Sequence, residues 1–160
     1  MTKRKADPSR RQRRSPVKDG GTIVGRYIES SALVAAILES DAAARASIRS
    51  KRQCVTSALT LTEASRAVLR ARGSGRITEQ QQRAALFSVQ RFARQCHIVS
   101  VSETILARAA RPFPVEPIRT LDALHLATVE ALGYAPAFVA LVTRDLRVRE
   151  NALALGYSVE

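Results

Sequence analysis

The sequence contains no tryptophan, and aromatic residues make up only 4% of its 160 residues. A hydrophobic core must therefore be built from Ala, Leu, Val and Ile, which suits helices packed on a buried parallel sheet. No apolar run approaches the roughly 20 residues of a membrane-spanning helix. The basic N-terminus also lacks the apolar stretch of a secretory signal. We therefore expect a cytoplasmic protein with one folded domain.

Cysteine is equally scarce, since Cys54 and Cys96 are the only two in the chain and lie in separate apolar runs. With no further cysteine, they cannot form the disulfide framework of a small secreted domain. We expect both to be buried core residues in a reducing compartment.

Acidic residues are few relative to basic ones, 14 against 26, which gives a formal net charge of +12. Residues 1–20 hold eight Lys or Arg and two Asp, so half of the excess lies in this eighth of the chain. We predict a basic disordered arm over residues 1–22 and a folded domain over 23–160. The arm either contacts phosphate or has no function. An excess of positive charge favours nucleic acid as a partner, but it does not distinguish a binding protein from an enzyme.

Short apolar runs alternate with longer helical patterns from residue 23 onward. We expect strands at 23–28, 54–57, 97–101, 137–143 and 157–159, with helices at 32–39, 41–52, 61–72, 78–95, 103–111, 121–132 and 146–155. The buried side of helix 78–95 is expected to carry Ala84, Leu86, Phe87, Val89 and Phe92. This alternation predicts an α/β fold in three layers, with a parallel sheet of about four to five strands covered by helices on both faces.

Four acidic residues stand where strands end or the following helices begin: Glu29, Glu63, Asp122 and Asp145. Strand C-termini and the following helix N-termini share one edge of a parallel sheet, where ligands bind. The four carboxylates are therefore expected to meet in one pocket, although they are far apart in sequence.

Each acid also has a purely structural interpretation. Glu63 completes a capping box with Thr60, and Asp122 suits the positive end of its helix. Asp145 can cap the helix that follows it, and Glu29 can be a solvated strand end. Glu103 also follows a predicted strand, which shows how easily this criterion is met.

The surroundings of Glu29 and Asp122 favour a functional interpretation, because both acids are flanked by apolar residues. Burying a lone carboxylate costs several kcal/mol, and neighbouring carboxylates repel one another unless a cation lies between them. Oxygen ligands without a convincing His or Cys cluster favour Mg²⁺ or Mn²⁺ over zinc.

Four segments at these acids resemble the PIN domain family, and within it the VapC-type toxins of toxin–antitoxin pairs. The segment 121–127, Leu-Asp-Ala-Leu-His-Leu-Ala, is similar to the family's Asp-Ala-x-His helix, its most specific motif. The other three are 27–34 (Tyr-Ile-Glu-Ser-Ser-Ala-Leu-Val), 59–63 (Leu-Thr-Leu-Thr-Glu) and 142–145 (Val-Thr-Arg-Asp). The resemblance spans roughly residues 26–160, in the family's order and spacing.

The resemblance implies a Mg²⁺- or Mn²⁺-dependent endoribonuclease that is usually a homodimer and is inhibited by a cognate antitoxin. By position, Glu29, Glu63, Asp122 and Asp145 would be the catalytic, metal-binding acids. Ser31 and Thr143 would be supporting hydroxyls. The preference for RNA rests on the resemblance alone.

One departure from the family pattern is Glu29, since the family normally has Asp there. The longer side chain moves the carboxylate by about one bond length, whereas catalytic geometry tolerates roughly 0.5 Å. Glu29 therefore keeps open the alternative of a weakened PIN-like protein that binds RNA or a partner. A housekeeping RNA-processing nuclease with no antitoxin is a separate alternative.

Basic residues near the acids are candidates for contacting RNA: Arg144, Arg147 and His125. His125 lies on nearly the same helix face as Asp122. It is either an RNA contact or proton carrier, or a hydrogen-bonded, half-buried histidine. The arginines are either phosphate contacts or a solvated charged face.

Overall fold

The computed structural model describes residues 24–49 and 52–160, in which five strands form one parallel sheet with the order β3-β2-β1-β4-β5. The strands are β1 (Gly25–Ile28), β2 (Gln53–Ser57), β3 (His97–Val99), β4 (Val139–Val142) and β5 (Ser158–Val159). The predicted α/β fold with a parallel sheet is confirmed. The predicted arm, residues 1–22, lies outside the described residues.

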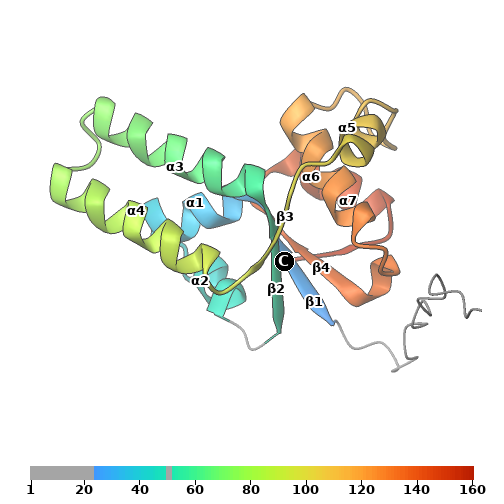
Figure 1. The fold of residues 1–160 in the computed structure, drawn as a ribbon, viewed down its shortest axis with the longest axis horizontal. Helices are drawn as coiled ribbons and strands as arrows, with labels where there is room; N and C mark the ends of the chain where they lie inside the picture. The colour runs from blue at the N-terminus through green and yellow to red at the C-terminus, as the bar shows by residue number, and fades with distance from the viewer. Residues whose placement is uncertain (1–23, 50–51) are drawn as a thin grey trace, which may run out of the picture.

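Two groups of helices cover the two faces of the sheet (Figure 1). The first consists of α1 (Ser30–Leu38), α2 (Ala42–Arg49), α3 (Ala58–Gly73) and α4 (Glu79–Ala93). The second consists of α5 (Glu103–Ala109), α6 (Thr120–Ala131) and α7 (Leu146–Ala154). A short 3₁₀ turn, Pro136–Phe138, leads into β4. Within the described ranges, no helix has the length and apolar character needed to span a membrane.

The alternation of side chains along the central strands divides the core in two. Tyr27 and Leu141 pack in the cluster with α5, α6 and α7. Their neighbours Ile28 and Val142 pack in the cluster with α1, α3 and α4. Because β1 and β4 are buried on both faces, their ends are held firmly at the edge where Glu29 and Asp145 lie.

The buried face of α4 differs from the predicted one. Its buried residues are Ala85, Val89 and Phe92, which repeat at helical spacing. Ala84 is exposed, and Phe87 has 59% of its surface exposed to solvent. The prediction was correct for Val89 and Phe92 and wrong for Ala84 and Phe87, because the buried stripe runs through Ala85 instead.

The cysteine prediction was also wrong, because Cys54 and Cys96 form a disulfide. The parallel register pairs Val55 with His97, which places the preceding residues Cys54 and Cys96 side by side. Their Cα atoms are 4.7 Å apart, within the range that a disulfide spans. Both residues are only partly buried. The cysteines therefore give no support to the expected reducing compartment.

Candidate metal centre

The four predicted acids lie at the C-terminal edge of the central strands, two as helix caps and two within helices. Glu29 follows β1 and caps α1, while Asp145 follows β4 and caps α7. Asp122 lies in the first turn of α6. Glu63 lies farther into its helix than predicted, because α3 begins at Ala58 with Ser57 as its cap. The predicted capping box at Thr60 is therefore absent, and Glu63 has a different partner.

Glu29 is buried, with only 3% of its surface exposed, so it is not a solvated strand end. Its Oε1 accepts a hydrogen bond from Ser30 Oγ at 2.5 Å. Its Oε2 accepts from Thr143 Oγ1 at 2.8 Å, from the Ser31 amide at 3.0 Å and from the Ser31 hydroxyl. These donors offset the cost of burying the carboxylate. The structure thus places Ser31 and Thr143, the two predicted supporting hydroxyls, in contact with the first acid.

Thr143 also connects Glu29 to the end of β4. Its Oγ1 accepts a hydrogen bond from the Asp145 amide at 3.0 Å while it donates to Glu29. Ser31 Oγ accepts in the same way from the Arg144 amide at 2.7 Å. The loops after β1 and β4 are therefore joined by hydroxyl groups at the sheet edge.

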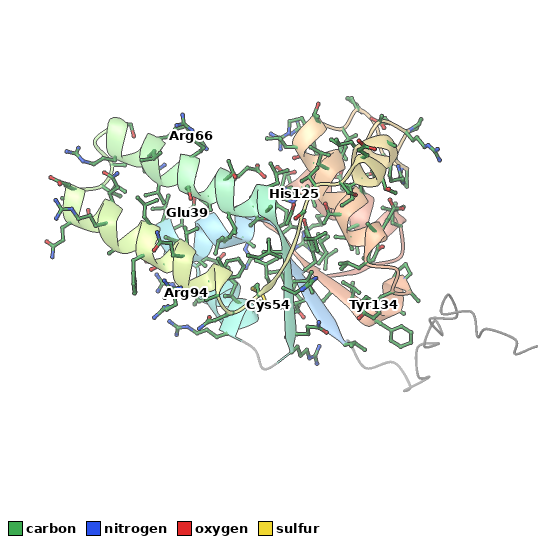
Figure 2. All side chains as sticks on the ribbon, in the orientation of Figure 1. Glu39, Cys54, Arg66, Arg94, His125 and Tyr134 are labelled. Carbon is green, nitrogen blue, oxygen red and sulfur yellow. A yellow bond between two sulfur atoms is a disulfide. The ribbon has the colours of Figure 1, made fainter. Side chains whose placement is uncertain are left out.

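Glu63 is held by His125, which lies between the two helical groups (Figure 2). The Nε2 atom of His125 is 2.7 Å from Glu63 Oε1 and 3.7 Å from Glu29 Oε1. On the other side of the ring, Nδ1 is 2.9 Å from the hydroxyl of Tyr27. The imidazole thus connects the acids of β1 and α3 to a tyrosine in the sheet.

The tautomer of His125 follows from the partners of its two nitrogens. Burial, followed by the charge of Glu29, raises the pKa of Tyr27 above its ordinary value, so its hydroxyl keeps the proton. We assign Nε2–H as the donor to the Glu63 carboxylate, because an ionised carboxylate can only accept. In the neutral ring, Nδ1 is then left to accept from the Tyr27 hydroxyl. His125 is 1% exposed, so the prediction of an RNA contact is wrong in this conformation. The alternative of a hydrogen-bonded histidine is correct, with a fully buried ring.

Asp122 and Asp145 share one cation, the guanidinium of Arg119. Nε of Arg119 is 2.8 Å from Asp122 Oδ2, and Nη2 is 3.3 Å from Asp122 Oδ1 and 2.5 Å from Asp145 Oδ2. The hydrogen bond and charge of Asp122, followed by the charge of Asp145, raise the pKa of Arg119. Asp145 Oδ1 also accepts from the amides of Arg147 and Val148, so it caps α7 as the structural interpretation predicted.

Arg119 was not among the residues that the sequence singled out. It stands at the N-cap of α6, three residues before Asp122, a spacing at which side chains on a helix can pair. That spacing is the only sequence signal for it.

The two predicted RNA-contact arginines lie in different environments. Nε of Arg144 donates to Asp41 Oδ2 at 2.7 Å, and this hydrogen bond is the main reason that the pKa of Asp41 falls from 3.8 to about 2. Arg144 therefore ties the end of β4 to the start of α2. Arg147 lies exposed in the first turn of α7, the helix that Asp145 caps.

The four acids thus form two linked pairs rather than one ready-made cluster. Among residues 24–49 and 52–160, no group of three or more His, Cys, Asp or Glu side chains stands ready to hold a metal ion. Asp122 and Asp145 fit a divalent cation, since one positive group already contacts both carboxylates. Glu29 and Glu63 have other partners in this conformation.

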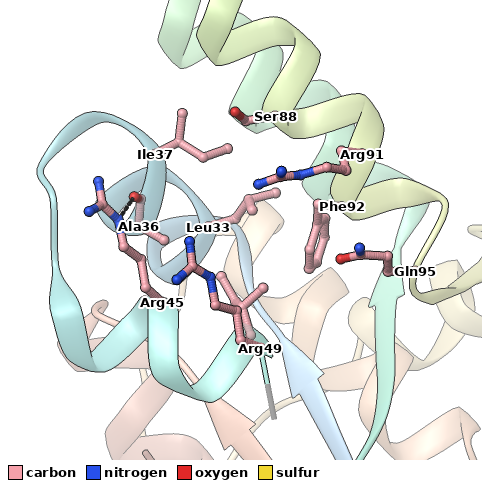
Figure 3. Close-up of a pocket in the computed structure, with 10 residues that line it drawn as sticks. Leu33, Ala36, Ile37, Arg45, Arg49, Ser88, Arg91, Phe92 and Gln95 are labelled. Carbon is pink, nitrogen blue, oxygen red and sulfur yellow. Dashed lines mark hydrogen bonds between the residues drawn. The ribbon is translucent and has the colours of Figure 1, made fainter. Parts of the chain in front are cut away.

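A separate groove lies on the face formed by α1, α2 and α4 (Figure 3), with a volume of about 350 Å³. Its floor includes the apolar side chains of Leu33, Ile37 and Phe92, and none of the four acids lines it. Its polar lining consists of three arginines with Ser88 and Gln95: Arg45, Arg49 and Arg91. This groove is suited to a partner with an apolar face and negative charge.

Comparison with known proteins identifies consistent similarities. A family model described as PIN domain matches residues 26–153. The chain is 36% identical over 137 residues to ribonuclease VapC35 of Mycobacterium tuberculosis, which covers 83% of this chain and 93% of that protein. It is 35% identical over 136 residues to ribonuclease VapC46 of the same organism, with coverages of 83% and 94%.

A solved structure, VapBC2 of Rickettsia felis bound to a DNA fragment from their promoter, aligns with a TM-score of 0.60. The alignment covers 85% of this chain and 97% of that chain at 13% sequence identity. At this identity, the similarity establishes the fold.

Proposed function

The chain belongs to the PIN domain family, and from this premise we propose that it is a divalent-metal-dependent endoribonuclease. It would act in the cytoplasm as the toxin of a toxin–antitoxin pair, cleaving RNA phosphodiesters with a metal-activated water. The ribonuclease names of its two Mycobacterium tuberculosis relatives support the reaction.

One observation in the structure carries this proposal. Asp122 and Asp145 bind a single positive group together at the carboxyl edge of the parallel sheet. Glu29 lies on the same edge and is connected to Asp145 through Thr143. Carboxylates arranged to share a cation at this edge are what a hydrolytic metal site requires.

The chain's own residues would hold and orient the reacting groups. Asp122 and Asp145 would supply oxygen ligands for Mg²⁺ or Mn²⁺. Thr143 and Ser31 fix the Glu29 carboxylate, and His125 fixes the Glu63 carboxylate. A bound divalent cation supplies a water of lowered pKa and positive charge for the scissile phosphate.

A second candidate function rests on Glu29 itself. Both of its carboxylate oxygens are engaged by hydroxyl and amide donors. Oε2 already accepts three hydrogen bonds, which leaves Oε1, with one, as the oxygen available to a metal. The alternative is therefore a catalytically weakened PIN-like protein that binds RNA or a partner.

For the partner, we propose a cognate antitoxin that docks in the groove of α1, α2 and α4. The three arginines at this groove complement an acidic segment, and its apolar floor complements an amphipathic one. We also propose that this chain assembles into a homodimer, as the family resemblance implies.

The test of the reaction is cleavage of a mixed-sequence structured RNA in Mg²⁺, in Mn²⁺ and in EDTA. Wild type is expected to cut only with metal. Asp122→Asn is expected to lose at least about a hundredfold in rate, since even outer-shell changes at metal sites cost 10–100-fold. Because Asn keeps the shape of the side chain, the thermal midpoint of this variant serves as the folding control.

Glu29→Asp separates the two candidate functions. A gain in rate would show that the natural glutamate weakens an active site. Cutting by Glu29→Asp without cutting by wild type would support the binding protein. If EDTA leaves cleavage by wild type unchanged, the metal-dependent mechanism is wrong.

A further inference from the structure

Arg119 occupies the position between two proposed metal ligands. Its guanidinium forms a fork with both oxygens of Asp122 and reaches Asp145 with one nitrogen. A divalent cation bound by both carboxylates must therefore take over contacts that Arg119 makes now. This inference rests on the proposed function of the site.

The side chain of Arg119 is free to exchange partners. It is 57% exposed, whereas the side chains of Asp122 and Asp145 are 9% and 23% exposed. Its backbone is fixed at the N-cap of α6, where its carbonyl accepts a hydrogen bond from the Ala123 amide. The guanidinium can thus leave the carboxylates for the solvent side while its attachment point stays beside them.

The local charges favour an ordered exchange. Two carboxylates and one guanidinium leave one uncompensated negative charge, which disfavours the approach of an RNA phosphate. When a divalent cation joins these three groups, their sum becomes one positive charge. The displaced guanidinium then lacks its carboxylate partners, and its planar fork of donors matches the oxygens of a phosphodiester.

We propose that Arg119 is an exchangeable counter-cation, which holds Asp122 and Asp145 until a divalent cation binds between them and then contacts the RNA phosphate beside the site. Before the metal binds, Arg119 competes with it for the two carboxylates. After the metal has bound, Arg119 contributes to binding of the reacting phosphate. Its loss should therefore improve metal binding and impair cleavage, two opposite effects from one substitution.

The test measures Mn²⁺ binding and RNA cleavage separately on the full chain. Isothermal titration calorimetry without RNA gives the Kd for Mn²⁺, and single-turnover cleavage at saturating Mn²⁺ gives the rate. For Arg119→Gln, we expect the Kd to fall about tenfold and the cleavage rate to fall at least about tenfold, because a charge beside two carboxylates is removed. Arg111→Gln removes an exposed arginine from the loop that precedes α6 and should change neither quantity.

Arg119→Lys provides a second measure of the same role. The ammonium retains the competing charge, so the Kd for Mn²⁺ should stay near that of wild type. Lysine lacks the planar fork, so cleavage should recover only in part. An Arg119→Gln variant with unchanged or weaker Mn²⁺ binding would overturn the counter-cation role, and one with tighter binding and undiminished cleavage would overturn the phosphate contact.

Failure of the proposed function is distinguishable from failure of this inference. If wild type cuts RNA with Mn²⁺ and Arg119→Gln binds Mn²⁺ no more tightly, only the inference fails. If Arg119→Gln binds Mn²⁺ more tightly and no variant cuts RNA, the counter-cation role is supported and both the nuclease and the phosphate contact are rejected. If neither protein binds Mn²⁺, both proposals are wrong.

Discussion

At the scale of single residues, the buried pair of Tyr27 and His125 determines how Glu63 is presented. The imidazole has a tyrosine hydroxyl on one nitrogen and a carboxylate on the other, and almost none of its surface meets solvent. A ring with both nitrogens occupied cannot rotate without losing two hydrogen bonds. Glu63 is therefore oriented by the sheet, through His125, although it stands on a helix.

Tyr27→Phe should destabilise the protein by about 1–3 kcal/mol, because it leaves the buried Nδ1 of His125 without a donor. The measurement is the free energy of unfolding in urea. Tyr134→Phe is the matched control: Tyr134 is 42% exposed and lies at the periphery (Figure 2), so its change should stay within about 0.5 kcal/mol. Equal effects of the two substitutions would contradict the hydrogen bond to Nδ1.

The positions of Glu29 and Asp145 at the sheet edge could be predicted because strand ends are visible as breaks in apolar runs. Asp145 is an example, because its position after a predicted strand suggested both a helix cap and a site residue. In the structure it caps α7 and also pairs with Arg119. The side chains that pair with the acids were harder to predict from the sequence. Arg119 is one of 26 basic residues, and its role depends on α6 and the loop after β4 meeting in space. The contact of His125 with Glu63 likewise joins residues 62 positions apart, on two different helices.

At the scale of elements, the strands were predictable and the rotation of a surface helix was not. The apolar run that became β4 is buried at every position, so its pattern leaves little choice of face. Helix α4 has one side on α1 and α3 and the rest in solvent. A single exposed Phe87 on such a helix costs little, so hydrophobicity alone did not indicate which stripe is buried.

The disulfide between β2 and β3 is also a property of elements, because it depends on their register. It joins cysteines 42 residues apart and attaches the edge strand β3 to the sheet. Closing a loop of this length should contribute about 2–4 kcal/mol. We therefore expect dithiothreitol to lower the free energy of unfolding of wild type by that amount.

The double variant Cys54→Ser/Cys96→Ser is the control, since its stability should not respond to dithiothreitol. Thiol titration of unfolded wild type should find free thiols only after reduction. If both thiols titrate before reduction, the bond is absent in the purified protein. The prediction also fails if reduction of a closed bond leaves the stability unchanged.

At the scale of the whole molecule, the candidate metal centre and the groove lie on different parts of the structure. The centre joins residues of both helical groups at the sheet edge. The groove is lined by α1, α2 and α4 with Gln95 just after α4 (Figure 3). Glu29 caps α1, and Leu33 from the next turn of α1 lines the groove. One helix thus connects the two, so a protein seated in the groove lies against the element that positions the first acid.

The groove predicts how charge affects binding of the proposed antitoxin. Arg49→Glu/Arg91→Glu should weaken binding by at least about tenfold, because two guanidinium groups that face an acidic segment become carboxylates. The measurement is calorimetric titration with the proposed antitoxin. Arg66→Glu/Arg70→Glu makes the same change in charge on the exposed side of α3 and should have a much smaller effect. Equal losses would indicate general electrostatic attraction, and unchanged binding in the groove variant would show that the partner docks elsewhere.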